Sequence, residues 1–350
     1  MRRREFLAAI GAMTLEVRYP AVEPRSGLSF PRDHGAHPEY RSEWWYLTGW
    51  LHTARSEPLG FQVTFFRARP PFDSANPSRQ APRQILLAHA ALADPVFGRL
   101  RHDQRAARVA LGLAGASEQT TAVWLDDWRL ALEGGRYRTR LAARDFSLEL
   151  ELEASDPPLE QGEAGYSRKG RRAGEASYYY SRPRLAARGA VDRGNGSEPV
   201  SGSAWLDHEW SSTLMAPEAA GWDWVGIELA DGGALMAFRM RDRQGAAHYA
   251  GGTLLGAQGH RRVFAPGEIA FEPRRRWRSP RTGVEYPVAM RVTAGSESWE
   301  LAPLMDDQEL DARASTGTIY WEGAVRALQR GREAGRGYLE LTGYWKPVRL

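Results

Sequence analysis

Hydrophobic and polar residues alternate along parts of this chain. From Phe146 to Glu153, every second residue is Phe or Leu, and the residues between them are Ser or Glu. Successive side chains of a β-strand point to opposite faces, so this pattern predicts a strand with one buried side and one solvent-facing side. The nearby pair Gly134-Gly135 is typical of a hairpin turn. The pattern therefore favours short antiparallel strands in this region.

Similar short segments, rich in β-branched and aromatic residues, recur between turn residues along the chain. More than a dozen such strands with almost no helix predict an all-β protein built from barrels or sandwiches. A weak helical pattern predicts one short helix at Ala324–Arg332. We expect strands at Ser42–Leu51, Gly60–Arg69, Gln84–Asp94, Ala122–Glu133, Tyr137–Ala143, Asp145–Glu153, Ser177–Val191, Ser201–Asp207, Trp222–Ala230, Gly233–Asp242, His248–Leu255, Glu268–Pro273, Val288–Thr293, Glu297–Ala302, Thr316–Arg326 and Gly337–Tyr344.

Composition sets limits on the function. The 350 residues are 42% hydrophobic and 26% charged, which is typical of a folded chain of one large or two ordinary domains. The net charge is only +4, and acidic residues are interspersed among the many arginines. Because no nucleic-acid-binding motif is present either, we expect no nucleic-acid partner. The chain has no cysteine, which excludes disulfides, thiolate metal sites and cysteine nucleophiles.

The N-terminus resembles a twin-arginine export signal. Arg3-Arg4 is followed by one spacer residue and then by Phe6-Leu7, and a short apolar stretch continues to Met13. We therefore interpret residues 1–27 as a signal and lead-in, and expect a periplasmic or secreted protein. No other apolar run is long enough to span a membrane, so the sequence predicts no transmembrane segment.

Two clusters combine ionisable residues with aromatic residues. The first runs from Asp33-His34 to His37 and continues in Glu43-Trp44-Trp45-Tyr46, and the second is Trp205–Trp210, followed by Gly221–Trp224. Ionisable groups resist burial, whereas Trp and Tyr favour it. Such a mixture indicates either the lining of a cavity or a buried network in which every polar group is paired.

These motifs make the chain resemble the AttH-like family, a group of predicted secreted proteins related to the bacterial carotenoid 1,2-hydratases. The resemblance rests on Phe30–Pro38, Glu43–Tyr46, Tyr179–Leu185, Gly202–Ser212 and Gly221–Trp224, and it extends from about residue 28 to the C-terminus. It implies two tandem lipocalin-like antiparallel β-barrels. We place them at residues 28–212 and 213–350, joined near Ser211–Gly221. Members of this family often accompany ABC-type export permeases, which implies such a permease as a partner.

The resemblance also implies candidate catalytic residues. The His-x-Trp motif of the hydratases is matched by His208-Glu209-Trp210. Their proton donor is an Asp in a following strand of the second domain, but the matching strand here, Gly233–Met240, contains no carboxylate. Asp223, between two tryptophans, is the nearest substitute. Protonation of a C=C bond requires a positioned acid and aromatic faces that stabilise a carbocation.

Three functional hypotheses follow. The first is a lipocalin-like protein that binds an apolar small molecule of isoprenoid type and serves as an accessory of an export system. The second is a hydratase or isomerase in which Asp207 or Asp223 donates a proton and His208 relays it. The third is a metal-dependent hydrolase that uses Asp33, His34 and His37 together with Asp207, His208 and Glu209. We expect the following residues to line the ligand-binding cavity: Asp33, His34, Trp44, Trp45, Tyr179, Glu209, Trp210, Trp222 and Trp224.

No cofactor is predicted. The His and Asp spacing matches no known metal motif, so we assign no metal ligand. The chain also has no serine-hydrolase elbow, phosphate-binding glycine loop or dinucleotide fingerprint. Nucleotide chemistry is therefore not expected.

Overall fold

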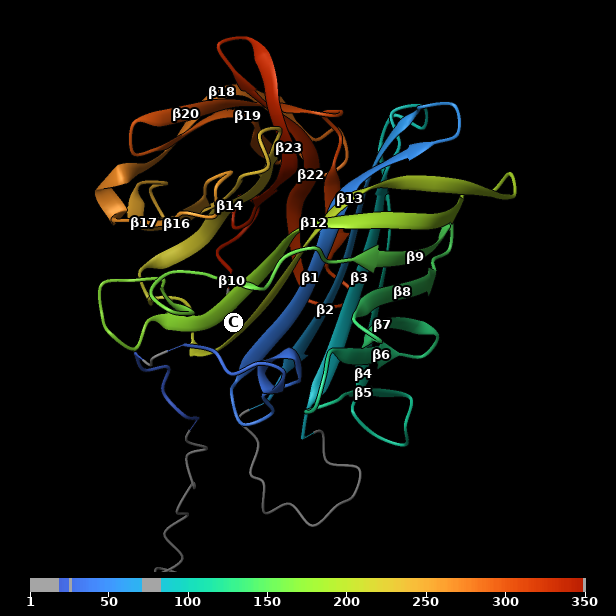
Figure 1. The fold of residues 1–350 in the computed structure, drawn as a ribbon, viewed down its shortest axis with the longest axis horizontal. Helices are drawn as coiled ribbons and strands as arrows, with labels where there is room; N and C mark the ends of the chain where they lie inside the picture. Colours follow the sequence, from blue (N-terminus) through green and yellow to red (C-terminus); the bar gives the residue numbers. More distant parts are fainter. Residues whose placement is uncertain (1–18, 25–26, 71–82, 349–350) are drawn as a thin grey trace, which may run out of the picture.

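A computed structural model describes residues 19–24, 27–70 and 83–348, and the predicted export signal lies outside this range. Within the described residues the chain consists of strands, turns and two short 3-10 segments, η1 (Arg32–His34) and η2 (Pro266–Glu268). The strands form two antiparallel sheets that curl into barrels, one after the other along the chain (Figure 1). This confirms the predicted all-β fold of two tandem barrels.

The N-terminal sheet contains the first thirteen strands in the order β4-β3-β2-β1-β13-β12-β9-β8-β7-β6-β5, with β10 and β11 also paired to β12. The long strands β1, β12 and β13 lie at its centre. The strands are β1 (Ser42–Thr53), β2 (Pro58–Ala68), β3 (Ile85–Ala93), β4 (Leu100–Arg108), β5 (Ala114–Ala116), β6 (Ala122–Leu125), β7 (Trp128–Glu133), β8 (Arg136–Ala142), β9 (Ser147–Glu153), β10 (Leu159–Glu160), β11 (Tyr166–Arg168), β12 (Ala176–Asp192) and β13 (Ser197–Thr213).

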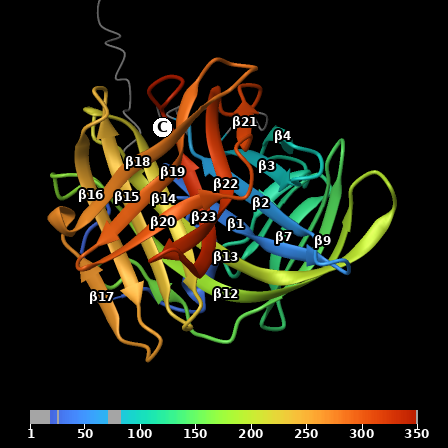
Figure 2. The ribbon, with the colours of Figure 1, turned by 90° about the horizontal axis from the view of Figure 1, so that it is seen from above.

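The C-terminal sheet has the order β17-β16-β15-β14-β23-β22-β20-β19-β18, with β21 paired to β22. Figure 2 shows the two sheets side by side, with β14, β22 and β23 facing β1 and β13. The strands are β14 (Ala219–Leu229), β15 (Ala234–Asp242), β16 (Ala247–Leu255), β17 (Arg261–Phe264), β18 (Ile269–Arg278), β19 (Glu285–Ala294), β20 (Glu297–Pro303), β21 (Glu309–Ala312), β22 (Thr318–Gln329) and β23 (Arg332–Leu341).

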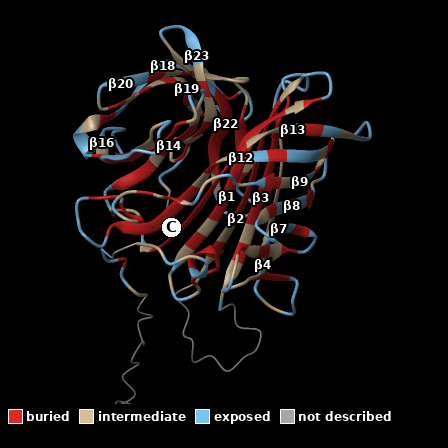
Figure 3. Cartoon of the chain, viewed as in Figure 1, coloured by how far each residue is buried: buried red, intermediate tan, exposed pale blue. Residues whose placement is uncertain are grey.

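Each barrel has its own apolar core, and a third apolar cluster lies between the two sheets. Figure 3 shows that the central strands are buried along most of their length. Strand β1 is buried on both faces because one face fills the first barrel and the other contacts the C-terminal sheet. The interface cluster contains Tyr46, Trp50, Tyr179, Trp205, Trp224 and Tyr338.

The seam of the first barrel is closed by side chains. Strand β4 lies at the edge of the sheet, and its Arg105 donates hydrogen bonds to the carbonyl oxygens of Leu125 (3.4 Å) and Ala142 (3.1 Å). Arg105 also forms an ion pair with Asp127 in the β6–β7 turn. No backbone ladder joins β4 to β5 among the described residues.

Some sequence predictions of local structure were wrong. Ala324–Arg332 is not helical, because it forms the end of β22 and the turn into β23. The predicted strand Ala122–Glu133 is a hairpin, β6–β7, whose turn contains Asp126 with a positive φ of 54°. Strand β4 was missed because its sequence, LRHDQRAAR, has no alternating apolar face. None of the described residues forms a helix long and apolar enough to cross a membrane.

Candidate functional site

The second motif is divided between two environments. Strand β13 runs through Trp205–Trp210, and its side chains alternate between the two faces of the sheet. His208 and Trp210 point into the first barrel, where they contact Trp45 and His37. Asp207 and Glu209 point the other way, toward the C-terminal sheet. The structure therefore separates Asp207 from His208, which the second hypothesis places in one catalytic group.

A polar network in the first barrel is centred on Glu43. Oε1 of Glu43 accepts hydrogen bonds from His208 Nε2 (2.8 Å) and His37 Nδ1 (2.9 Å). Oε2 accepts one from Arg67 Nε (2.8 Å), and the other His37 ring nitrogen lies 3.2 Å from Asp33 Oδ1. We call Asp33, His37, Glu43, Arg67 and His208 the Glu43 network.

The Glu43 network is closed by aromatic rings. The indole of Trp210 stacks on the His37 ring at 3.6 Å between centroids, and Trp45 stacks on His208 at 4.8 Å. Glu43 and His208 have no exposed surface, and Arg67 is 1% exposed. The network is therefore buried, and most of its hydrogen bonds join its own side chains.

Protonation in the network follows from these contacts. Burial opposes ionisation of Glu43, but hydrogen bonds from His208 and His37 and the Arg67 charge hold its pKa well below the usual value. Burial would lower the pKa of His37, yet hydrogen bonds to Asp33 and Glu43 outweigh it and raise that pKa. Burial lowers the pKa of His208. The carboxylates of Asp33 and Glu43 thus balance the charges of His37 and Arg67.

His34 extends the network toward the surface. The Tyr180 hydroxyl lies 3.1 Å from Nδ1 of His34 and 3.2 Å from Nδ1 of His208. A hydroxyl both donates and accepts, so it links two neutral imidazoles. Burial lowers the pKa of His34 to about 4, which agrees with a neutral ring. A continuous hydrogen-bonded chain thus runs through Asp33, His37, Glu43, His208, Tyr180 and His34.

A metal ion fits this network poorly. His37, Glu43 and His208 offer ligand atoms that all lie within 4.8 Å of one another. However, Glu43 Oε1 already accepts hydrogen bonds from both imidazoles, and the Arg67 guanidinium occupies its second oxygen. A bound cation would have to displace these donors. Asp207 and Glu209, which the third hypothesis adds to the ligand set, lie on the opposite face of β13.

A second polar cluster lies between the sheets and is centred on Asp207. Oδ2 accepts a hydrogen bond from the Tyr179 hydroxyl (2.6 Å), and Oδ1 accepts bonds from Ser181 (2.5 Å) and Trp205 Nε1 (2.6 Å). Trp224 Nε1 of the C-terminal sheet donates to the Tyr179 hydroxyl (3.0 Å). Burial raises the pKa of Asp207 to about 7, although the three donors act against this shift. A carboxyl of this kind exchanges its proton near neutral pH.

Glu209 lies beside Asp207 and is paired with Lys169. Lys169 Nζ is 3.0 Å from Glu209 Oε1, and Ser177 also donates to this oxygen. The ammonium group of Lys169 lies over the rings of Tyr179 (4.7 Å) and Phe238 (4.2 Å). Lys169 therefore links the two sheets as well as neutralising one carboxylate.

Two further carboxyls enter the interface from the C-terminal sheet. Glu322 on β22 and Glu340 on β23 are directly opposite in the antiparallel register. Burial raises the pKa of Glu340, helped by the charges of Asp207 and Glu209, and burial and Glu340 raise that of Glu322. Asp207, Glu209, Glu322 and Glu340 form what we call the interface carboxyl cluster.

Sequence reasoning missed Glu322 and Glu340 as site residues. The segments Tyr320–Gly323 and Tyr338–Tyr344 both resemble Trp45–Trp50, and this repeated aromatic pattern was the available signal. In an alternating strand such as Tyr338–Leu341, a Glu is expected on the solvent-facing side. Here that side faces the other sheet.

Asp223 is remote from the interface carboxyl cluster. Its neighbours Trp222 and Trp224 face the N-terminal sheet, so Asp223 points into the second barrel. Arg239 Nε (2.9 Å) donates to one carboxylate oxygen, and Arg241 Nε (3.0 Å) and the Tyr344 hydroxyl (2.9 Å) donate to the other. Both oxygens are occupied, which leaves Asp223 a structural contact rather than a group facing a ligand.

The predicted aromatic residues also divide by face. Trp44, Trp222 and Trp224 line the interface together with Tyr179, whereas Trp45 and Trp210 fill the first barrel. Trp44, Trp222 and Glu340 are each partly exposed, although the strands that carry them are largely buried. Solvent therefore reaches this part of the interface.

A cleft of about 700 Å³ opens between the two halves of the chain. One wall comes from Gly162, Glu163 and Tyr166–Arg168 and the other from Met236, Phe238 and Tyr249, and Arg171 and Glu268 also line the cleft. Met236 and Phe238 also belong to the apolar cluster between the two sheets, so the cleft adjoins that cluster. Its volume is in the usual range for a small-molecule site.

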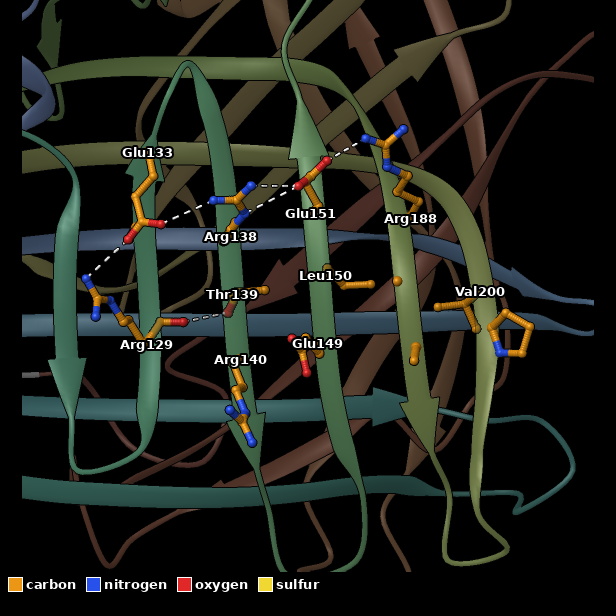
Figure 4. Close-up of a pocket in the computed structure, with 14 residues that line it drawn as sticks. Arg129, Glu133, Arg138, Thr139, Arg140, Glu149, Leu150, Glu151, Arg188 and Val200 are labelled. Atoms are coloured by element: carbon orange, nitrogen blue, oxygen red, sulfur yellow. Dashed lines mark hydrogen bonds and ion pairs between the residues drawn. The ribbon is translucent and has the colours of Figure 1, made fainter.

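A second hollow, of about 790 Å³, lies on the outer face of the N-terminal sheet (Figure 4). It contains none of the predicted site residues. Across β7, β8, β9 and β12, Arg129, Arg138 and Arg188 pair with Glu133 and Glu151, with 3.0 Å between Arg138 and Glu151. The pairs are exposed and mutually satisfied, which is typical of a solvated sheet face.

Comparisons with known proteins agree with this description. A family model described as AttH-like matches residues 21–344. The crystal structure of a candidate AttH from Nitrosomonas europaea is 51% identical, covers 93% of this chain and 99% of that chain, and has a TM-score of 0.87. No curated protein matches the sequence.

Two structures with lower identity share the fold. Kievitone hydratase from Nectria haematococca has a TM-score of 0.70 at 14% identity, covering 94% of this chain and 97% of that chain. CghA has a TM-score of 0.52 at 16% identity, covering 93% and 96%. At these identities the likeness concerns the fold alone.

Proposed function

The chain belongs to the AttH-like family, and from this premise we propose that it is a hydratase or isomerase acting on a C=C bond of a mainly apolar small molecule. The reaction would take place at the interface between the two sheets, beside the cleft that Met236 and Phe238 line. The observation that carries the proposal is the Asp207 carboxyl, which is 3% exposed, lies among aromatic rings and has its pKa raised to about 7. An acid of this kind delivers and regains a proton at neutral pH.

The hydrogen-bond partners of Asp207 support this role. Tyr179 and Ser181 are hydroxyls that either donate or accept, so they accommodate both the ionised and the protonated carboxyl. Glu340 is partly exposed and electrostatically coupled to Asp207, which suits it to serve as the base. Two neighbouring carboxyls with raised pKa values are a common arrangement for an acid–base pair.

The proposed reaction passes through a carbocation. Protonated Asp207 gives its proton to one carbon of the C=C bond, and the other carbon becomes cationic. The faces of Trp44, Trp222 and Trp224 stabilise this cation. In a hydratase, the oxygen of water then bonds to the cationic carbon while ionised Glu340 takes a proton from that water. In an isomerase, Glu340 removes a proton from a neighbouring carbon instead, and a new C=C bond forms. Proton exchange with solvent restores both carboxyls.

The fold gives further support. Kievitone hydratase, named for hydration chemistry, has the same arrangement of two sheets. A shared fold does not fix the substrate, so the substrate here is defined only by the cleft. Met236, Phe238 and Phe264 favour an apolar body, and Glu163, Arg168, Arg171 and Glu268 in the same lining favour polar groups at its end.

Isotope labelling tests the proposal. Purified protein is incubated with a solvent extract of its host in ¹⁸O-labelled water and, separately, in deuterated water, and products are followed by mass spectrometry. A hydratase adds both ¹⁸O and hydrogen to a compound, and an isomerase incorporates deuterium without ¹⁸O. Loss of labelling with Asp207→Asn, but not with the exposed Asp145→Asn, would assign the chemistry to the interface around Asp207.

Two other outcomes would contradict the proposal. Labelling that survives Asp207→Asn would place the chemistry elsewhere. A compound that co-purifies and is released unchanged would refute catalysis, and would favour a carrier role such as that of an exported accessory of an ABC-type permease.

We also propose export through the twin-arginine route, on the basis of Arg3 and Arg4. Replacing both with Lys should keep the precursor in the cytoplasm, because the route reads the paired arginines specifically. The measurement is the periplasmic yield of tagged full-length protein. An unchanged yield with Arg3→Lys/Arg4→Lys would contradict the proposal, and Arg18→Lys serves as the matched control.

A further inference from the structure

The interface contains unpaired polar atoms on both of its faces. From the N-terminal sheet these are the Tyr46 hydroxyl, the Thr48 hydroxyl and Gln62 Oε1, and from the C-terminal sheet Glu322 Oε1 and the Tyr338 hydroxyl. All five residues are at least nine-tenths buried. A buried polar atom without a partner is costly, and native proteins rarely retain several in one place.

These atoms belong to one site. Tyr46 and Thr48 are on the same face of β1, and Thr48 is directly opposite Gln62 on β2. The Tyr46 hydroxyl approaches the Glu322 carboxyl without a hydrogen bond of normal geometry. Tyr338 lies two residues before Glu340 on the same face of β23, and Glu340 is directly opposite Glu322. We call these groups the Glu322 subsite.

Among the described residues, no cation lies beside the two carboxyls of this subsite, and burial raises their pKa values. Like carboxylates directly opposite each other on neighbouring strands repel, and their burial adds to the cost. Aromatic rings border the pair, since Trp224 is directly opposite Glu340 and packs edge-on against Tyr46 at 5.3 Å. Carboxylates among aromatic faces are the usual surroundings of a bound ammonium group.

We propose that the Glu322 subsite binds an ammonium group, so that the ligand of this protein is an apolar molecule carrying an amine. The cation would donate hydrogen bonds to Glu322 Oε1 and Gln62 Oε1 and rest against the rings of Tyr46 and Trp224. A neutral hydroxyl would pair with the hydroxyls but would leave the carboxyl pair without a cation beside it. This inference rests on the proposed function in one respect, namely that a small molecule enters the interface where Trp44, Trp222 and Glu340 are partly exposed.

Three probes with the same ring system test the proposal: naphthalene, 2-naphthol and 2-naphthylmethylamine, which is cationic at neutral pH. Their binding to the full chain is measured by equilibrium dialysis at pH 6, 7 and 8. The amine should bind about tenfold more tightly than naphthalene at pH 7. Its affinity should rise with pH, because ionisation of the carboxyls strengthens binding of a cation.

Variants locate the effect. Glu322→Gln should remove most of the advantage of the amine while leaving naphthalene binding within about twofold, and the exposed Glu149→Gln should change neither. If Glu322→Gln does not fold, the pH dependence of the wild-type protein decides the question. An amine affinity that falls or stays constant between pH 6 and 8 would overturn the proposal.

The remaining outcomes separate this inference from the proposed function. Equal binding of all three probes, or a preference for 2-naphthol, would refute the ammonium site and leave the apolar cleft intact. Absence of binding by every probe would refute the ammonium site and also weaken the cleft as a ligand site.

Discussion

Glu43→Gln should lower the free energy of unfolding by about 3–5 kcal/mol, the usual effect of removing one partner of a buried ion pair. The substitution conserves shape but leaves Arg67 buried without a counter-charge, and it places an amide donor opposite His208 or His37. The measurement is urea unfolding followed by tryptophan fluorescence at pH 7. The exposed Glu149→Gln should change the free energy of unfolding by less than about 0.5 kcal/mol.

A double substitution makes this test specific. Arg67→Met in the Glu43→Gln background removes the orphaned charge, so part of the lost stability should return. If Glu43→Gln alone costs less than about 1 kcal/mol, the network has rearranged around the amide, and the charge balance described for Asp33, His37, Glu43 and Arg67 would be incorrect.

Asp207→Asn should reduce turnover of the substrate by about 10²–10⁴-fold, the range typical of a lost general acid. The ionisation of Asp207 also affects the stability of the wild-type protein, which should depend on pH. Because burial raises the pKa of Asp207 to about 7, the folded protein retains a proton that the unfolded chain gives up at acidic pH. Wild-type stability should therefore fall as the pH rises through 7, by about 1 kcal/mol for this group between pH 6 and 9.

The free energy of unfolding, measured at pH 6 and at pH 9, shows whether the stability falls as the pH rises. Asn does not ionise, so Asp207→Asn should lose less stability than the wild type between pH 6 and 9. Its amide can accept from Trp205 and donate to the Tyr179 hydroxyl, which preserves the local hydrogen bonds. A variant that unfolds more readily at pH 9 than the wild type would contradict the assignment of a raised pKa to Asp207.

Alternation along strands predicted most of the fold and only part of the site. The pattern of Phe146–Glu153 was sufficient because β9 has one face in the barrel core and one in solvent. The same pattern in Tyr338–Leu341 was misleading, since its polar face is covered by another sheet. Which face of a barrel meets a second barrel depends on contacts between residues hundreds of positions apart, and one sequence does not encode these in any local pattern.

The clusters of acidic and aromatic residues could be recognised in the sequence, but their grouping in space could not be predicted. Asp207 and His208 are neighbours in sequence, yet period-two geometry sends them into different compartments. Glu43 could be recognised as part of a sequence motif. Its place at the centre of a network became apparent only from the way β1, β2 and β13 lie together. Asp223 looked similar to Asp207 in sequence, and only the two arginines opposite it on β15 distinguish them.

The seam of the first barrel has a consequence for the behaviour of this protein in concentrated solution. An exposed edge strand is a template on which the strand of a second molecule can grow, and this is a common beginning of fibrous aggregation. Strand β4 is such an edge, but three arginines, Arg101, Arg105 and Arg108, line it. Arg101 and Arg105 bond across its open side to backbone carbonyls of the opposite strands and turns, so an approaching strand would have to displace these contacts. The residues that close the barrel therefore also protect the molecule from assembling with copies of itself.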